Sequence, residues 1–237
     1  MLSYDSPVSL NGQSPVSPTN LTTSRQAMAP SKPVIVTKPT DNTLSNNAPS
    51  YGAALQPAHH HIWLVTGPAG CGKTTVAGHL AGALDIPYVE GDEFHSPENV
   101  AKMSRGQALT DEDRWDWLTR LREEALKQLA LGHDGVVVTC SALKRKYRDV
   151  IRVAPYFSPG LQVHFIYLDA PQEVLQQRVA QRQGHYMGAG MVQSQFAILQ
   201  APMRDEIDCI TIDVSRSSDE VCRAALDQVV KKLSEDR

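Results

Sequence analysis

The feature that most constrains this chain is the octapeptide at residues 67–74, Gly-Pro-Ala-Gly-Cys-Gly-Lys-Thr, which fits the pattern GxxxxGK[ST]. It follows a short apolar run at residues 62–66 and opens a helical pattern at residues 73–84. In that context the glycines let the backbone N–H groups wrap around phosphates, and the helix adds its partial positive N-terminus. We therefore predict a nucleotide-phosphate site within an α/β fold.

This loop also predicts its ligands, ATP and Mg²⁺. Lys73 is expected to reach the β- and γ-phosphates and to assist catalysis, and the Thr74 hydroxyl is the expected magnesium ligand. Cys71 lies within the loop, and we interpret it as a small neutral side chain that fills space rather than as a reactive thiolate that can be oxidised. The residues predicted to contact the nucleotide are Gly67, Pro68, Ala69, Gly70, Cys71, Gly72, Lys73, Thr74 and Thr75.

The remainder of the chain from residue 58 alternates short apolar runs with helical periods, as βαβ units do. The predicted strands are 62–66, 87–90, 136–140, 162–168 and 209–213, and the predicted helices are 73–84, 111–131, 173–182, 191–199 and 218–233. Residues 96–110 are predicted to form a polar loop. The pattern predicts a three-layer P-loop kinase fold, a five-stranded parallel sheet flanked by helices, with ligands at the carboxyl ends of the strands.

Residues 1–57 have a different composition, rich in Ser, Thr, Pro and Asn and without a sustained apolar period. We interpret them as a disordered leader, followed by a kinase domain at residues 58–237. A mitochondrial transit peptide is the alternative, but Arg25 is the only arginine in this segment. His59, His60 and His61 are interpreted as a linker into the first strand rather than as a metal site.

Composition excludes several classes of partner. A net charge of −3 with 21% charged residues lacks the basic excess of a nucleic-acid-binding protein. No apolar stretch approaches the roughly 18 residues that span a bilayer. The four cysteines are scattered, with no CxxC spacing and no signal sequence, which is typical of a cytoplasmic protein. A small-molecule substrate is therefore expected, without nucleic acid or membrane.

The acceptor side is predicted where the second strand ends, at Glu90, Asp92 and His95. Phosphoryl transfer needs a carboxylate that orients the acceptor hydroxyl and takes its proton, and Asp92 is the best-placed candidate. His95 would contact the same substrate, and Glu90 would hold magnesium through water. The structural alternatives are a turn cap for Asp92 and a loop histidine for His95.

Cations near the predicted cleft indicate an anionic acceptor. Arg114 lies in the first turn of a helix, the wrong end for the helix dipole, which suggests that it binds an anion such as a carboxylate. Lys144 and Arg148 are four residues apart in a dense basic cluster after the third strand. We expect this cluster to need a compensating anion, with a solvated basic face as the alternative.

A mobile lid is predicted from the helix at residues 173–182 and the glycine-rich stretch 183–190. Closure would bring Arg178 and Arg182 onto the β- and γ-phosphates, where they would stabilise charge in the transition state. A surface helix is the structural alternative. The adenine contacts are expected from the loop at residues 214–217.

Several further blocks coincide with a known family: the chain resembles the small P-loop gluconokinases, relatives of shikimate kinase and the nucleoside monophosphate kinases. The resemblance runs from about residue 61 to residue 230, in blocks at residues 67–74, 90–95, 102–103, 109–118, 140–149, 182–187 and 194–202. It implies phosphorylation of D-gluconate to 6-phosphogluconate by a homodimer. It also implies that Asp92, His95, Arg114, Lys144, Arg148 and Gln195 face the sugar acid. The leader and the sequence at residues 187–191 depart from the family pattern.

Two alternatives remain at this point. A shikimate kinase or nucleotide kinase would share the phosphate loop and the lid, although the acceptor blocks match gluconokinases better. A nucleotide-binding regulatory module would bind ATP without transferring phosphate, but Asp92, Arg178 and Arg182 are all present, which favours an enzyme.

Overall fold

The computed structural model describes residues 59–181 and 189–236, so the predicted leader lies outside the described residues. Its strands are β1 (His60–Thr66), β2 (Tyr88–Glu90), β3 (Gly135–Thr139), β4 (Leu161–Asp169) and β5 (Cys209–Asp213). Its helices are α1 (Lys73–Leu84), the 3-10 turn η2 (Gly91–Phe94), α2 (Pro97–Ser104), α3 (Glu112–Ala130), α4 (Arg145–Arg152), α5 (Ala154–Phe157), α6 (Gln172–Ala180), α7 (Ala189–Ile198) and α8 (Ser218–Glu235). Within these residues no helix combines the length and the apolar character that a bilayer crossing requires.

The five strands form one parallel sheet in the order β2-β3-β1-β4-β5. β1 is central and buried from His61 onward, which accounts for its unbroken apolar run, because both of its faces are covered. The predicted five-stranded parallel sheet is confirmed. Since all strands run the same way, the residues that follow them converge at one edge of the sheet.

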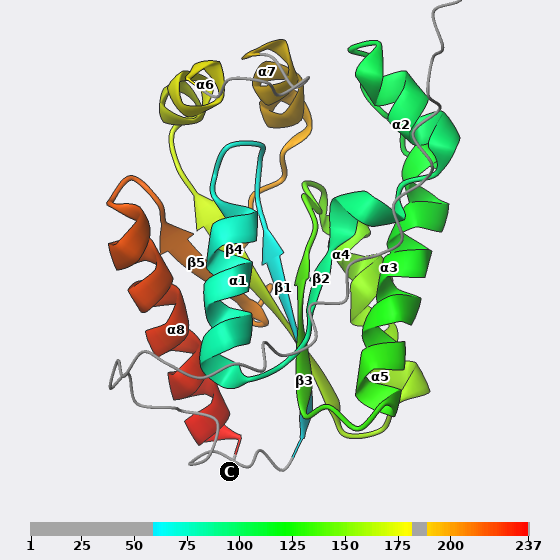
Figure 1. The fold of residues 1–237 in the computed structure, drawn as a ribbon, viewed down its shortest axis with the longest axis vertical. Coiled ribbons are helices and arrows are strands. Elements are labelled where there is room, and N and C mark those ends of the chain that lie inside the picture. Colours follow the sequence, from blue (N-terminus) through cyan, green and yellow to red (C-terminus); the bar gives the residue numbers. More distant parts are fainter. Residues whose placement is uncertain (1–58, 182–188, 237) are drawn as a thin grey trace, which may run out of the picture. The chain divides into compact units, whose positions relative to one another are not determined.

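Two hydrophobic cores lie on the two faces of this sheet, because successive side chains of a strand point to opposite sides. Trp63 packs with residues of α1 and α8 on one face, whereas Leu64 packs with residues of α3 and α4 on the other. Figure 1 shows α1 and α8 on one side of the sheet and α3, α4 and α5 on the opposite side. The three-layer arrangement is thus confirmed.

The prediction of a polar loop at residues 96–110 was wrong for its first half, where the chain forms α2. The Ser96 side chain accepts a hydrogen bond from the Asn99 N–H at 3.2 Å, and Pro97 occupies the first helical position. Both are ordinary helix-start signals. The short length of α2 and its polar composition hid them from a search for apolar periodicity.

Candidate active site

The loop between β1 and α1 has the backbone geometry of a phosphate cradle. Gly70 and Gly72 have φ angles of 85° and 99°, a region that other residues rarely adopt. Gly72 is the N-cap of α1, and no side chain of the described residues caps that end of the helix. The first N–H groups of α1 are therefore available to an anion.

Two side chains contact this loop. The Lys73 ammonium group donates to the carbonyl oxygens of Gly67 and Pro68 at 3.1 and 3.2 Å. The Gln195 side-chain oxygen, from α7, accepts the Ala69 N–H at 2.6 Å. A phosphate that entered the cradle would compete for the same lysine and the same N–H group.

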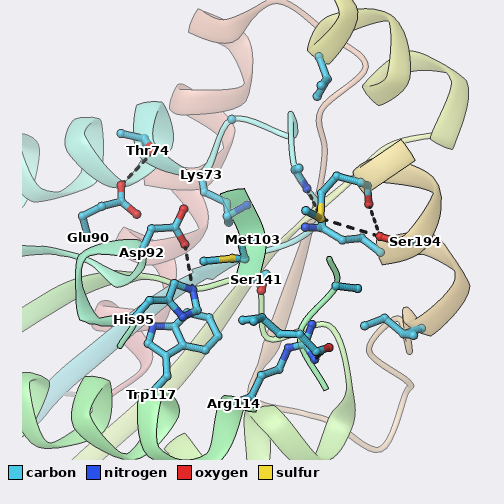
Figure 2. Close-up of a pocket in the computed structure, with 18 of the residues that line it drawn as sticks. Lys73, Thr74, Glu90, Asp92, His95, Met103, Arg114, Trp117, Ser141 and Ser194 are labelled. Atoms are coloured by element: carbon cyan, nitrogen blue, oxygen red, sulfur yellow. Dashed lines mark hydrogen bonds and ion pairs between the residues drawn. The ribbon is translucent and has the colours of Figure 1, made fainter. Parts of the chain in front are cut away.

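A cavity of about 450 Å³ opens beside the loop, at the carboxyl edge of the sheet (Figure 2). Ten of the residues predicted from the sequence line it: Ala69, Gly72, Lys73, Thr74, Thr75, Glu90, Asp92, His95, Arg114 and Gln195. These ten residues thus share a single cavity, although they come from the phosphate loop, α1, the end of β2, the segment around η2, α3 and α7.

Glu90 forms the centre of an oxygen-rich cluster at the end of β2. One carboxylate oxygen accepts the Thr74 hydroxyl at 3.0 Å and also the Tyr88 hydroxyl, and the other accepts the Thr139 hydroxyl. Carboxylate and hydroxyl oxygens are the ligands that Mg²⁺ prefers. This donor set therefore fits a magnesium ion, with Thr74 and Glu90 as the residues that could hold it.

Asp92 lies on η2 and presents its carboxylate to the cavity, where 58% of the side chain is exposed. Desolvation within the cavity raises the pKa of this carboxyl group, and nearby Glu90 adds to the effect, while Lys73 opposes it. A carboxylate with a raised pKa accepts a proton more readily, which suits a general base.

His95 is held against Trp117, with ring centroids 4.0 Å apart and planes 22° apart (Figure 2). Trp117 in turn donates from its indole nitrogen to the Gly91 carbonyl at 2.7 Å. Burial lowers the pKa of His95 to about 4, and the Arg114 charge contributes. The imidazole is therefore neutral near pH 7, and its Nε2 lies 4.0 Å from the Asp92 carboxylate.

Arg114 is the cation of α3 that lines the cavity. One of its terminal nitrogens donates to the carbonyl oxygens of Leu109 and Thr110, the second at 2.8 Å, and its guanidinium carbon lies 5.3 Å from the Tyr147 ring centroid. These contacts fix the guanidinium group at the wall of the cavity, where it could bind an anionic substrate.

The prediction that Arg148 faces the substrate is corrected by the structure. Its side chain is 2% exposed and makes two hydrogen bonds to the Glu206 carboxylate, at 2.7 and 2.6 Å. Arg148 does not line the cavity, and neither does Lys144, whose ammonium donates to Asp111 at 2.8 Å. The anion that balances this basic cluster is thus supplied largely by the protein's own carboxylates.

Arg178 lines a second cavity, of about 380 Å³, which also borders the phosphate loop. Its guanidinium donates to the Val214 carbonyl at 2.7 Å. The lining of this cavity combines the phosphate loop with the segment that follows β5: Gly70, Cys71, Gly72, Thr75, Val76, Arg178, Val214, Arg216, Ser217, Ser218 and Val221. Arg182 and most of the predicted glycine-rich lid stretch lie outside the described residues.

Sequence reasoning missed the residues that complete the first cavity, most of them apolar: Met103, Ala108, Leu109, Trp117, Ser141, Val179, Met191, Ser194 and Ile198. A search for titratable groups overlooks such side chains, because in sequence they resemble ordinary core residues. Trp117 shows the difficulty, since it is 3% exposed and packs in the core, yet it also lines the cavity.

Comparison with known proteins relates this chain to shikimate kinase and to gluconokinases. Residues 69–233 match the shikimate kinase family model. A probable gluconokinase of Schizosaccharomyces pombe is 43% identical over 187 residues, covering 76% of this chain and 93% of the relative. A gluconokinase of Gluconobacter oxydans is 44% identical over 143 residues, covering 60% of this chain and 77% of the relative.

Solved structures of a gluconokinase and of a sugar kinase also resemble this chain. A gluconokinase from Sinorhizobium meliloti superposes with a TM-score of 0.66 at 37% identity, covering 76% of this chain and 97% of that protein. A sugar kinase from Janibacter sp. HTCC2649 gives a TM-score of 0.65 at 41% identity, covering 73% and 95%. With this similarity, and with a phosphate loop of the P-loop pattern between β1 and α1, the chain belongs to the gluconokinase family of P-loop kinases.

Proposed function

We propose that this protein transfers the γ-phosphoryl group of ATP to D-gluconate, giving 6-phosphogluconate and ADP. The observation that carries the proposal is that Asp92 and Lys73 line the same cavity. Phosphoryl transfer depends mainly on positioning and electrostatic stabilisation, so a base for the acceptor and a cation for the donor must meet at one point.

The nucleotide is assigned to the loop and the second cavity. Its phosphates would occupy the uncapped N-terminus of α1, and Lys73 would move from the loop carbonyls to the phosphate oxygens. The adenine ring of ATP would lie in the second cavity, beside Val214 and Ser217. Arg178 lines that cavity, and together with Arg182 it is proposed to neutralise phosphate charge.

Magnesium is assigned to Thr74 and Glu90, whose side-chain oxygens already lie 3.0 Å apart. Bound there, the ion would supply positive charge to the phosphate oxygens. Tyr88 and Thr139 hold the Glu90 carboxylate in place by hydrogen bonds, so its orientation is fixed before any ligand binds.

Gluconate is assigned to the remainder of the first cavity. Asp92 accepts the proton of the attacking 6-hydroxyl group, and Arg114 pairs with the substrate carboxylate. Neutral His95 can hydrogen-bond a sugar hydroxyl without adding charge beside Arg114. Gln195 can reach the same space from α7, because it lines the cavity.

The alternatives are a shikimate or nucleotide kinase, or a module that binds nucleotide without catalysis. All are tested by measuring ADP release by the purified protein with Mg-ATP and a panel of gluconate, shikimate, other sugar acids and nucleoside monophosphates. We expect turnover that depends on gluconate. Turnover with another acceptor alone would reassign the substrate, and ATP binding without turnover would support the regulatory module.

Three further features are part of the proposal. A homodimer rests on the family resemblance. A cytoplasmic location rests on the four cysteines, which are all free thiols in the structure. A disordered leader at residues 1–57 rests on its composition. Sedimentation of the purified protein and microscopy of a tagged full-length chain would test the first two.

A further inference from the structure

A second cluster of ligand-bearing side chains lies at the opposite end of the sheet from the active site. His61 on β1, His164 on β4 and Asp236 after α8 each offer one ligand atom, and these atoms lie within 4.8 Å of one another. His61 precedes Thr66, the last residue of β1, by five residues, which corresponds to about 17 Å of strand. The cluster is thus separate from the phosphate loop.

The sheet register brings the two histidines together. Trp63 pairs with His164 across β1 and β4, and His61 lies two residues before Trp63, so all three share one face. Their rings are stacked, with centroids 4.3 Å apart for Trp63 and His164 and 5.3 Å apart for the two histidines. The imidazoles are therefore held rigidly before any ligand arrives.

The polar atoms of this cluster are incompletely satisfied. His61 is 1% exposed, and its Nε2 has no hydrogen-bond partner among the described residues. One oxygen of Asp236 is likewise buried without a partner in this part of the chain, while the other lies 3.9 Å from the Lys232 ammonium. Buried polar atoms without partners are rare and costly, and the free Asp236 oxygen could gain a partner in a bound ion. The His61 atom that faces His164 is Nδ1, so the unpartnered Nε2 is not the atom offered to that ion.

The geometry and the chemistry of the donors favour a transition metal. His61 Nδ1 and His164 Nε2 lie 3.2 Å apart, close to the separation of about 3.3 Å between two ligand nitrogens of a tetrahedral zinc ion. Each neutral imidazole has one ring nitrogen that can present a lone pair to an ion. Two imidazoles and one carboxylate suit Zn²⁺ better than Mg²⁺ or Ca²⁺.

We propose that His61, His164 and Asp236 form a three-ligand zinc-binding site that ties the C-terminal end of α8 to β1 and β4. The ion would replace the hydrogen bond between the two histidines with two metal–nitrogen bonds. The carboxylate of Asp236 would offset part of its charge. In the hydrogen bond between the two rings one imidazole donates and the other accepts, so only the donor has to change its tautomer before both nitrogens can bind the ion.

The test uses the full-length protein, purified without a polyhistidine tag, treated with EDTA and desalted. Zn²⁺ is titrated by calorimetry, and the thermal unfolding midpoint is followed in parallel. We expect one equivalent of Zn²⁺ per chain. At a free concentration about 100 times Kd, the midpoint should rise by about 5–10 °C.

Two variants and one control locate the ion. His164→Phe keeps an aromatic ring against Trp63 but removes a ligand, and Asp236→Asn removes the anionic oxygen at a helix end, where misfolding is not expected. Each should weaken zinc binding by about 100-fold or more, since loss of even an outer-shell partner costs 10–100-fold. His60→Ala changes an exposed histidine of the same strand and should leave zinc binding unchanged.

Several outcomes would overturn the proposal. The first is the absence of zinc binding by the wild-type protein. The second is binding that both ligand variants retain, which would place the ion elsewhere. Loss of binding in His60→Ala would assign the ion to the run of histidines at the start of β1. None of these readouts depends on ATP or gluconate, so they are independent of the proposed enzymatic function.

Discussion

The role of Asp92 as a proton acceptor can be tested by a single substitution. The change Asp92→Asn keeps the size of the side chain but removes its ability to accept a proton. We expect turnover with gluconate to fall by about 10² or more, while ATP binding persists. Single-turnover kinetics and calorimetry with a non-hydrolysable nucleotide would measure the two effects separately.

The pH profile gives a second readout of the same residue. Because desolvation raises the pKa of Asp92, turnover should decline at acidic pH with an apparent pKa above that of an ordinary aspartate. That decline should disappear in Asp92→Asn. Near-normal turnover in this variant would exclude Asp92 as the base.

Arg114 is expected to bind the carboxylate of the acceptor. In Arg114→Gln, the KM for gluconate should rise by about 10-fold or more, because a charge-assisted hydrogen bond contributes roughly 1.5–3 kcal/mol. The KM for ATP should change little. Lys146→Gln is the matched control, since Lys146 is a neighbouring cation that is 48% exposed and pairs with Asp111 outside the cavity.

Equal effects of the two substitutions would contradict a specific role for Arg114 and would indicate a general electrostatic contribution instead. Steady-state kinetics at two salt concentrations would distinguish these cases, because a diffuse effect is screened by salt and a direct contact is screened less.

At the level of single residues, the sequence was enough to place a side chain at the cavity when that residue directly follows a predicted strand. Asp92 and His95 follow directly from the end of β2, so a predicted strand was enough to place them at the cavity. Arg148 could not be placed in this way. Its partner Glu206 is 58 residues away in sequence, and only the tertiary fold shows that they meet.

Among the elements, the junction of β2 and η2 is the most tightly constrained, because it lies between Glu90 and Asp92. A Cβ atom on Gly91 would lie 1.9 Å from the Thr139 carbonyl oxygen, a backbone atom of the adjacent strand. We expect Gly91→Ala to destabilise the fold by about 1–3 kcal/mol, as overpacking does, and to reduce turnover by displacing both carboxylates.

Gly82→Ala provides the comparison. Gly82 lies in α1, and a methyl group added to it would meet no atom of the described residues within 4 Å. Alanine there should therefore stabilise the helix by about 0.5–1 kcal/mol. Urea denaturation of both variants would measure the two changes. The constraint at Gly91 would be disproved if its alanine variant were as stable as the wild type.

The elements with apolar periods were the ones that could be predicted from sequence. The predicted boundaries of α1 and β5 match those observed, and β1 differs only by an earlier start. α2 was missed because it buries little, with Asn99 as its buried residue, so no apolar stripe marks it. Its cap and proline were visible, but such local signals also occur in turns.

For the whole molecule, three buried imidazoles predict sensitivity to acid. Burial lowers the pKa of His61, His95 and His164 to about 4, whereas in the unfolded chain each is near 6.5. Below pH 6.5 the unfolded chain therefore binds protons that the folded protein does not, and stability falls until the pH nears 4. The free energy of unfolding should change with pH by at most about 4 kcal/mol per pH unit.

Chemical denaturation in EDTA at pH values from 7.5 to 5 would measure this loss. Asp113 and Glu206 also stabilise the fold, but their pKa values are lowered to about 2, so their contribution is lost only at more acidic pH. His164→Gln should reduce this pH dependence by about one third. A stability that stays flat over this range would contradict the prediction.

The two cavities share Gly72 and Thr75, which contribute to the lining of both. They therefore adjoin at the start of α1 and form two compartments with a common wall. A single compound that joined an adenosine polyphosphate to a sugar-acid mimic would be able to occupy both compartments. Such a compound would contact Asp92, His95 and Arg114 through its acceptor half, so its binding would depend on residues that a nucleotide alone need not reach.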